Sequence, residues 1–251
     1  MTYCLAMRLD EGLVFLSDTR TNAGVDNIST YRKLHVFTPA EDRVFVLQPA
    51  GSLATTHQVL DRIRVDLAAP NGTESLRSVD HLHEAALYLG RLNREVAAEH
   101  AQALAAVGAD GTATFILGGQ VGDEPPELFL VHGEGNYIHV SEDRPFLQIG
   151  ESKYGKFLLD FAVTAGVDLD TATKVALGSM MSTSRANLSV GPPYDGAVYR
   201  NGSHELHQFR VEADSSVLRE LQEIWYLHLL SVIEALPSLA APEETDAVQP
   251  D

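Results

Sequence analysis

Cysteine is almost absent from this sequence, because its 251 residues include only Cys4. A single cysteine cannot form an internal disulfide, so the fold must be stabilised by burial of apolar side chains. Hydrophobic residues make up 45% of the chain, which is enough for a large core. This composition suits a reducing compartment, and we expect a cytoplasmic globular protein.

Basic residues are also scarce. Lys and Arg total 18 against 35 Asp and Glu, a net charge of -17, and the Lys and Arg residues form no cluster. Binding to a phosphate backbone requires clustered basic side chains, so nucleic acid is excluded as a partner. No window approaches the roughly 20 consecutive apolar residues of a membrane span. The first residues also lack the basic and apolar regions of a secretory signal, so we expect no membrane partner.

Apolar residues alternate with a period of two in some segments and recur with a period of 3.6 in others. The expected strands span residues 2–9, 12–17, 33–37, 43–48, 112–117, 127–132, 137–141, 146–149, 197–200 and 205–211. The expected helices span residues 52–69, 79–107, 154–164, 169–185 and 217–236.

The order of these elements predicts the fold class. Helices follow one another in pairs, whereas a doubly wound parallel fold would alternate single strands with single helices. Short strands joined by tight turns favour antiparallel pairing. We therefore expect an α+β protein, a four-layer α-β-β-α sandwich of two antiparallel sheets between helix layers. Residues 1–237 should form a single domain, and residues 238–251 a flexible acidic tail.

Thr2 is the most informative residue for function. A small second residue allows removal of Met1, which would leave Thr2 with a free α-amine. An α-amine titrates near pH 8, so part of it is a neutral base under working conditions. Because the amine and the hydroxyl belong to one residue, Thr2 could combine a nucleophile with its base.

Two charged residues accompany Thr2 in the sequence. Asp18 ends the second expected strand, beside the first, and Lys33 opens the third. A carboxylate would stabilise the lysine charge, and that charge would ease loss of a proton from the threonine. The alternative interpretation is an ion pair buried at a strand end with no catalytic role.

Taken together, Thr2, Asp18 within Ser17-Asp18-Thr19-Arg20, and Lys33 resemble the active-site pattern of proteasome β subunits, which are N-terminal nucleophile hydrolases. The resemblance implies that Thr2 attacks a peptide carbonyl, Lys33 assists its deprotonation and Asp18 holds the lysine. Gly51 resembles the family glycine whose backbone N–H stabilises the oxyanion.

Two later segments extend the resemblance. Residues 150–155 resemble the Gly-Ser-Gly loop that opens the third helix, where either Glu151 or Ser152 could match the family serine. Residues 187–191 resemble the family's Asp-x-x-Ser-Gly segment, with Asn187 in place of the aspartate and Ser189 as its serine. Over roughly residues 2–235 the sequence resembles most the bacterial branch of ancestral β subunits called Anbu.

The resemblance implies a threonine-type peptidase that works in a homo-oligomeric ring or open spiral. Its substrates would be peptides or unfolded proteins, with an ATP-dependent unfoldase as a candidate partner and no cofactor or metal. Two alternatives stay open: a scaffold or binding chamber with little hydrolysis, favoured by Asn187 and Ser152, and an amidase for small amides.

Other motifs are weaker. Gly150 to Lys156 nearly spells a phosphate loop, but Phe157 stands where a Ser or Thr should bind magnesium. His204 and His207 are one residue short of a zinc helix spacing. Cys4 is interpreted as a buried core thiol.

Overall fold

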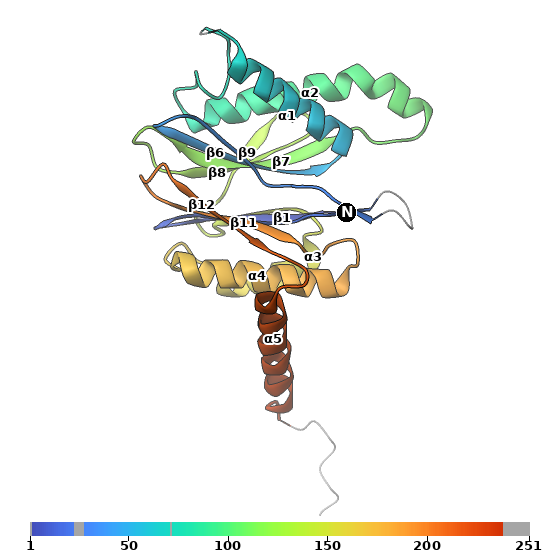
Figure 1. The fold of residues 1–251 in the computed structure, drawn as a ribbon, viewed down its shortest axis with the longest axis vertical. Helices are drawn as coiled ribbons and strands as arrows, with labels where there is room; N and C mark the ends of the chain where they lie inside the picture. Colours follow the sequence, from blue (N-terminus) through green and yellow to red (C-terminus); the bar gives the residue numbers. More distant parts are fainter. Residues whose placement is uncertain (1, 23–27, 71, 238–251) are drawn as a thin grey trace, which may run out of the picture. The chain divides into compact units, whose positions relative to one another are not determined.

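The computed structural model describes residues 2–22, 28–70 and 72–237. These residues form five helices and three antiparallel sheets, which confirms the prediction of a mixed α+β protein (Figure 1). The chain divides into two compact units, Met1–Ala213 and Asp214–Asp251.

The first sheet carries the N-terminal strand at its second position, in the order β10-β1-β2-β11-β12. Neighbouring strands are antiparallel, and Leu9 pairs with Gly12 across the tight turn between β1 and β2. The hairpin expected at the start of the chain is therefore confirmed. The strands are β1 (Tyr3–Leu9), β2 (Gly12–Asp18), β10 (Phe146–Gly150), β11 (Tyr194–Arg200) and β12 (Leu206–Val211).

The second sheet has the order β5-β6-β7-β8-β9, which is a simple antiparallel meander. Its strands are β5 (His35–Ala40), β6 (Arg43–Gly51), β7 (Ala113–Val121), β8 (Glu127–Val131) and β9 (Tyr137–His139). The third sheet pairs β3 (Arg20–Asn22) with β4 (Ile28–Thr30).

Capping residues set where the helices begin. Ser52 caps α1 (Leu53–Ala68) by accepting the N–H of Thr55, and Asp168 caps α4 (Leu169–Ala186) in the same way. Helix α2 (Leu82–Ala106) begins at Leu82 and not at the expected residue 79, because the Glu84 carboxylate accepts the N–H groups of Asp80 and His81 there. Helix α3 (Lys153–Ala162) precedes α4 and packs against it.

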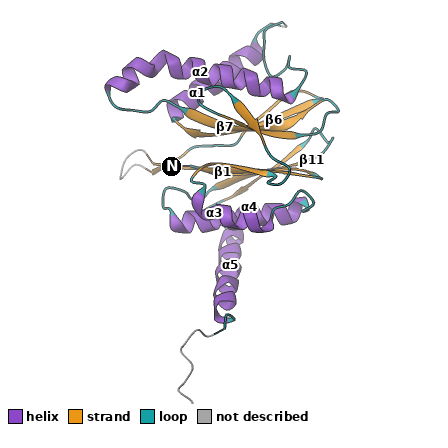
Figure 2. Ribbon diagram, turned by 180° about the vertical axis from the view of Figure 1, so that it is seen from behind, coloured by secondary structure: helices purple, strands orange, loops and turns teal. Residues whose placement is uncertain are grey.

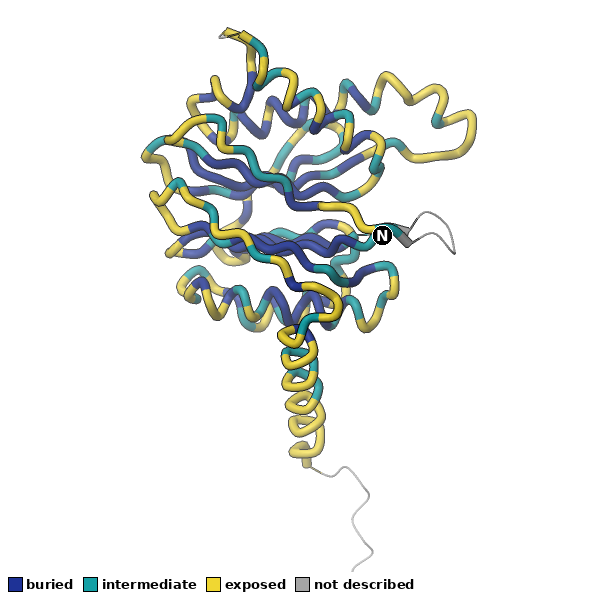
Figure 3. The backbone as a smooth tube through the Cα atoms, viewed as in Figure 1, coloured by how far each residue is buried: buried dark blue, intermediate teal, exposed yellow. Residues whose placement is uncertain are grey.

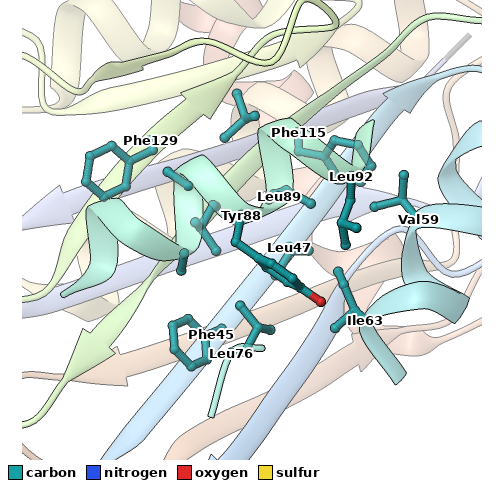
Figure 4. Close-up of a cluster of buried hydrophobic side chains, with 14 of the residues drawn as sticks. Phe45, Leu47, Val59, Ile63, Leu76, Tyr88, Leu89, Leu92, Phe115 and Phe129 are labelled. Carbon is teal, nitrogen blue, oxygen red and sulfur yellow. The ribbon is translucent and has the colours of Figure 1, made fainter. Parts of the chain in front are cut away.

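Two apolar cores lie on the two faces of the second sheet. One face packs against α1 and α2, where side chains such as Phe45, Tyr88 and Phe115 are buried together (Figure 4). The opposite face packs against the first sheet, through Phe15 of β2, Val46 of β6 and Ile116 of β7. Figure 3 shows the strands of both sheets as mostly buried. Helices α3 and α4 lie against the first sheet (Figure 2).

Strand β7 is longer than the expected segment 112–117, because two glycines that look like a break continue it. A Cβ on Gly118 would lie 2.3 Å from Leu128 and 2.7 Å from the ring of Phe15. Glycine at this position therefore lets the two sheets approach, and the strand runs on to Val121.

The polar stretch 19–32 is not without structure, because it contains β3 and β4. The expectation that Lys33 opens a strand is wrong, since β5 begins at His35 and extends through Pro39 to Ala40. A shift in the pairing of β5 with β6 between Phe37 and Ala40 accommodates that proline.

The second unit contains α5 (Ser216–Glu234). Ser215 caps its start by accepting the N–H of Leu218, and the helix ends before Pro237, as the sequence predicts. Large apolar side chains on α5 are exposed, among them Ile224, Leu230 and Ile233. The expected acidic tail, 238–251, lies outside the described residues.

Among the described residues, the helices all fall short of the length and apolar character that a membrane crossing requires.

His35 gives the fold a predictable response to acid. Burial, followed by the charges of Arg64, His57 and Arg32, lowers the pKa of His35 to about 4 from 6.5. The unfolded chain binds a proton below pH 6.5 and the folded chain does not, so stability falls as the pH drops from about 6.5 towards 4. Above that window the imidazole is neutral in both states and contributes nothing.

We expect the free energy of unfolding of the wild type to fall by about 1–2 kcal/mol more than that of His35→Gln between pH 7 and pH 5. Urea unfolding at both pH values measures this difference. An equal loss in the two proteins would show that folding does not shift the pKa of His35.

Candidate active site

The main chain of Thr2 is held by the loop that follows β10. The carbonyl of Thr2 accepts the N–H of Glu151 at 2.7 Å, and Tyr3 pairs with Gly150 at the end of β10. Gly150 has a φ of +82°, and a Cβ there would lie 1.9 Å from the Thr2 carbonyl oxygen. Only glycine fits this approach, so the loop fixes the position of Thr2.

Asp18 and Lys33 form a buried ion pair beside Thr2. The Lys33 Nζ donates to Asp18 Oδ1 at 2.8 Å and to the Arg20 carbonyl at 2.5 Å. The N–H of Tyr3, the residue after Thr2, donates to the same Asp18 oxygen at 2.9 Å. The side chain of Asp18 is fully buried and that of Lys33 is 6% exposed. One carboxylate therefore joins the lysine to β1, the strand that begins directly after Thr2.

Burial is the largest influence on the pKa of Asp18 and raises it above the ordinary value. The Lys33 ammonium opposes that rise, as do the N–H groups of Tyr3 and Gly191. Removing any of these partners would weaken the opposition to burial and favour the neutral form of the Asp18 carboxyl group.

The loop between α4 and β11 contacts the second carboxylate oxygen of Asp18. The N–H of Gly191 donates to Asp18 Oδ2 at 3.4 Å. Arg20 donates to the carbonyl of Leu188 at 2.8 Å, and the Thr19 hydroxyl donates to the carbonyl of Pro193 at 2.8 Å. The residues that follow Asp18 in the chain thus anchor this loop.

Gly51 ends β6 with a φ of +109°, directly before the residue that caps α1. Two contacts join the last residues of β6 to the first sheet. The Cys4 Sγ lies 3.8 Å from the Pro49 carbonyl, and Gln48 Nε2 donates to the Leu16 carbonyl at 3.0 Å. The structure thus brings the end of β6 to the end of β1 that begins with Tyr3.

The two serines lie in the loops that hold Thr2 and Asp18. Ser152 is the first residue before α3 and its side chain makes no capping bond, while its N–H donates to the Gly150 carbonyl at 3.0 Å. Ser189 donates its N–H to Asn187 Oδ1 at 2.9 Å. Asn187 Nδ2 in turn donates to Glu151 Oε2 at 2.9 Å, so the two loops are joined.

Sequence reasoning missed the hydroxyl of Tyr3. Gln148 Nε2 donates to it at 2.5 Å, and it lies 2.7 Å from Ser179 Oγ. Since Ser179 donates its only proton to the Gly155 carbonyl, the Tyr3 hydroxyl must be the donor to Ser179. Burial raises the pKa of Tyr3 to about 12, so the phenol stays neutral. In the sequence, only the position of Tyr3 next to Thr2 could have drawn attention to this hydrogen-bonded hydroxyl.

Cys4 is fully buried, as the sequence predicts, and burial raises the pKa of its thiol. Within residues 2–22, 28–70 and 72–237, no three His, Cys, Asp or Glu side chains are grouped so that they could hold a metal ion.

Among known proteins, similarity is found in solved structures. No family model matches the chain, and neither does any curated protein. Anbu (ancestral β-subunit) from Yersinia bercovieri is 40% identical with a TM-score of 0.89, covering 96% of this chain and 100% of that one. The helical assembly of the Anbu complex from Pseudomonas aeruginosa is also 40% identical, with a TM-score of 0.89 and coverage of 98% and 100%.

A third match, Anbu from Hyphomicrobium sp. strain MC1, is 38% identical with a TM-score of 0.86, covering 96% of this chain and 100% of that one. The paired antiparallel sheets and the buried ion pair beside the first strand thus occur here in a chain with a proteasome-like fold. The chain belongs to the Anbu (ancestral β-subunit) family.

Proposed function

We propose that the chain is a threonine-type peptidase subunit that uses Thr2 as its nucleophile. The observation that carries this proposal is the position of the buried ion pair. Asp18 accepts hydrogen bonds from Lys33 at 2.8 Å and from the Tyr3 N–H at 2.9 Å through one oxygen. A positive charge is therefore held next to the residue whose hydroxyl must lose a proton.

In the proposed reaction, removal of Met1 frees the α-amine of Thr2. The amine accepts the proton of the Thr2 hydroxyl as Oγ1 attacks the substrate carbonyl carbon. The N–H of Gly51 donates to the oxyanion that forms. The amine then protonates the leaving nitrogen, and water releases the acyl group from Thr2.

Asp18 and Lys33 are the activating pair in this proposal, with the lysine charge favouring the alkoxide-like state of Thr2. Ser152 and Ser189 are supporting residues, because their loops hold the Thr2 carbonyl and Asp18 through Glu151 and Gly191. The fold itself is proposed to be the α-β-β-α sandwich of N-terminal nucleophile hydrolases, with residues 1–237 as one domain. Neither a cofactor nor a metal takes part in the proposed reaction.

We also propose that copies of the chain assemble into a ring or open spiral with the sites facing inwards. A helical assembly is known for the Anbu complex of Pseudomonas aeruginosa, and the exposed apolar side chains of α5 suit contacts between copies. Enclosure would restrict hydrolysis to peptides and unfolded proteins, delivered in the proposed scheme by an ATP-dependent unfoldase. The buried thiol and the absence of a second cysteine suit the cytoplasm.

Hydrolysis of an unstructured protein, of its folded form and of a small amide would test this proposal. We expect cleavage of the unstructured chain that is lost in Thr2→Ala and retained in part by Thr2→Ser. Cleavage of the small amide alone would favour the amidase. No hydrolysis of any substrate by an assembled, Met1-free protein would favour the scaffold.

A further inference from the structure

Glu151 makes two contacts that together connect the nucleophile to a second loop. Its N–H donates to the Thr2 carbonyl at 2.7 Å, and its carboxylate accepts from Asn187 Nδ2 at 2.9 Å. The first contact lies on the main chain of Thr2. The second lies on the first residue after α4. Glu151 therefore links the main chain of Thr2 to Asn187, through one hydrogen bond from its N–H and one to its side chain.

The position of Glu151 is tightly determined by its neighbour. Gly150 packs so closely against Thr2 that a Cβ would lie 1.9 Å from the Thr2 carbonyl oxygen. Residue 151 follows that contact directly, and its own N–H is hydrogen-bonded to the Thr2 carbonyl. A change in the position of Glu151 would therefore disturb the main chain of Thr2.

The orientation of Asn187 is fixed by chemistry. The N–H of Ser189 can only donate, so the oxygen of the Asn187 amide must face it, at 2.9 Å. The amide nitrogen must then face Glu151, where it donates to the carboxylate. Two residues further on, Gly191 donates its N–H to Asp18. The segment 187–191 therefore links Glu151 to the activating pair.

This arrangement reverses the pattern expected from the family resemblance. That pattern places a hydroxyl in the loop before α3 and a carboxylate in the loop after α4. Here the carboxylate is on Glu151 and its uncharged partner is Asn187. An aspartate at 187 would place two hydrogen-bond acceptors, both negative, against each other. The amide of Asn187 thus offers Glu151 the donor that an aspartate would lack.

We propose that Glu151 is a positioning residue for Thr2, and that Glu151 and Asn187 are a matched pair in which the carboxylate has moved from the second loop to the first. The pair fixes the position of Thr2 relative to Asp18 and keeps one negative charge on the residue whose N–H holds the Thr2 carbonyl. This inference rests on the proposed function, because the charge matters only where the α-amine of Thr2 is the base.

Three variants separate the hydrogen bond from the charge. Glu151→Gln keeps an acceptor for Asn187 and removes the charge. Asn187→Asp sets two carboxylates against each other. The double variant restores one carboxylate and one amide with their places exchanged. Glu41→Gln, an exposed residue in the turn between β5 and β6, is the matched control.

The first readout is the pKa of the Thr2 α-amine, measured by its labelling with a neutral amine-reactive reagent across pH. A carboxylate beside an ammonium raises the pKa of that ammonium, so Glu151→Gln should lower it by about half a unit to one unit. The double variant should return it towards the wild-type value. The second readout is the rate of adduct formation with a peptide epoxyketone, which should be slowest in Asn187→Asp and recover at least tenfold in the double variant.

An amine pKa that is unchanged in Glu151→Gln, or a double variant as slow as Asn187→Asp, would overturn the inference. Failure of the proposed function would be seen separately, in the wild type. There, retained Met1 or a free amine without adduct would appear before any variant is compared.

Discussion

Replacing Lys33 by methionine is expected to slow adduct formation between Thr2 and a peptide epoxyketone by at least about a hundredfold. Methionine has a similar length and no charge, so the variant removes the ammonium that lies 2.8 Å from Asp18, together with its hydrogen bond to the Arg20 carbonyl. In the proposed mechanism, loss of that charge makes removal of the Thr2 proton less favourable. The rate constant for adduct formation, followed by intact mass, measures the effect.

The same substitution should also destabilise the fold, because it leaves the fully buried Asp18 side chain without its counter-ion. Removing one member of a buried pair costs about 3–5 kcal/mol, and the cost falls as the orphaned carboxylate takes up a proton. The double variant Lys33→Met, Asp18→Asn is the control, since it removes both charges. It should regain stability but not reactivity. A Lys33→Met protein that reacts at the wild-type rate would contradict the proposed role of the lysine.

Gly150→Ala is the second substitution with a large expected effect. Its Cβ would lie 1.9 Å from the Thr2 carbonyl oxygen, so either the strand β10 or the main chain of Thr2 must move. A displacement of about 1 Å in a catalytic group can cost about a hundredfold in rate. We expect a loss of that size in adduct formation, together with a lower midpoint of urea unfolding.

Gly202→Ala is the matched control for Gly150→Ala. Gly202 also has a positive φ, +71°, but a Cβ there would point into open space, with no neighbouring atom within 4 Å. The two variants share the cost of a left-handed alanine, about 1 kcal/mol, and differ in the collision with Thr2. Equal rates of adduct formation in the two variants would show that the loop at Gly150 does not position the nucleophile.

The segments with a clear hydrophobic period were predicted well from the sequence. Helix α4 begins at Leu169, as expected, and ends one residue beyond the expected position. The hairpins around Gly12 and Asn201-Gly202 are present, because turn chemistry is local and does not depend on distant packing.

The errors came where a distant contact determines the structure. Gly118 looks like the end of a strand, yet it continues β7 because Phe15 and Leu128 leave no room for a side chain. Pro39 looks like a turn residue, yet it lies within β5, where the strand pairing shifts. The local sequence around Gly118 does not identify Phe15 and Leu128 as its neighbours, and the local sequence around Pro39 does not show how β5 pairs with β6.

In the candidate site, too, some features could be predicted from the sequence and others depend on distant contacts. Thr2, Asp18 and Lys33 were identified by their resemblance to the active-site pattern of proteasome β subunits, and the structure places the last two in contact beside the strand that follows Thr2. Their catalytic role stays a prediction. The hydrogen bond between Glu151 and Asn187 joins residues 36 positions apart, so no local pattern could reveal it.

The intact mass of the purified protein before and after treatment with a peptide epoxyketone tests the proposed role of Thr2 most directly. The account predicts a mass without Met1, a gain of one adduct per chain, and no adduct on Thr2→Ala. Retention of Met1 would contradict it, because the α-amine would be blocked. An adduct that persists in Thr2→Ala would contradict it equally, because another residue would then be the nucleophile.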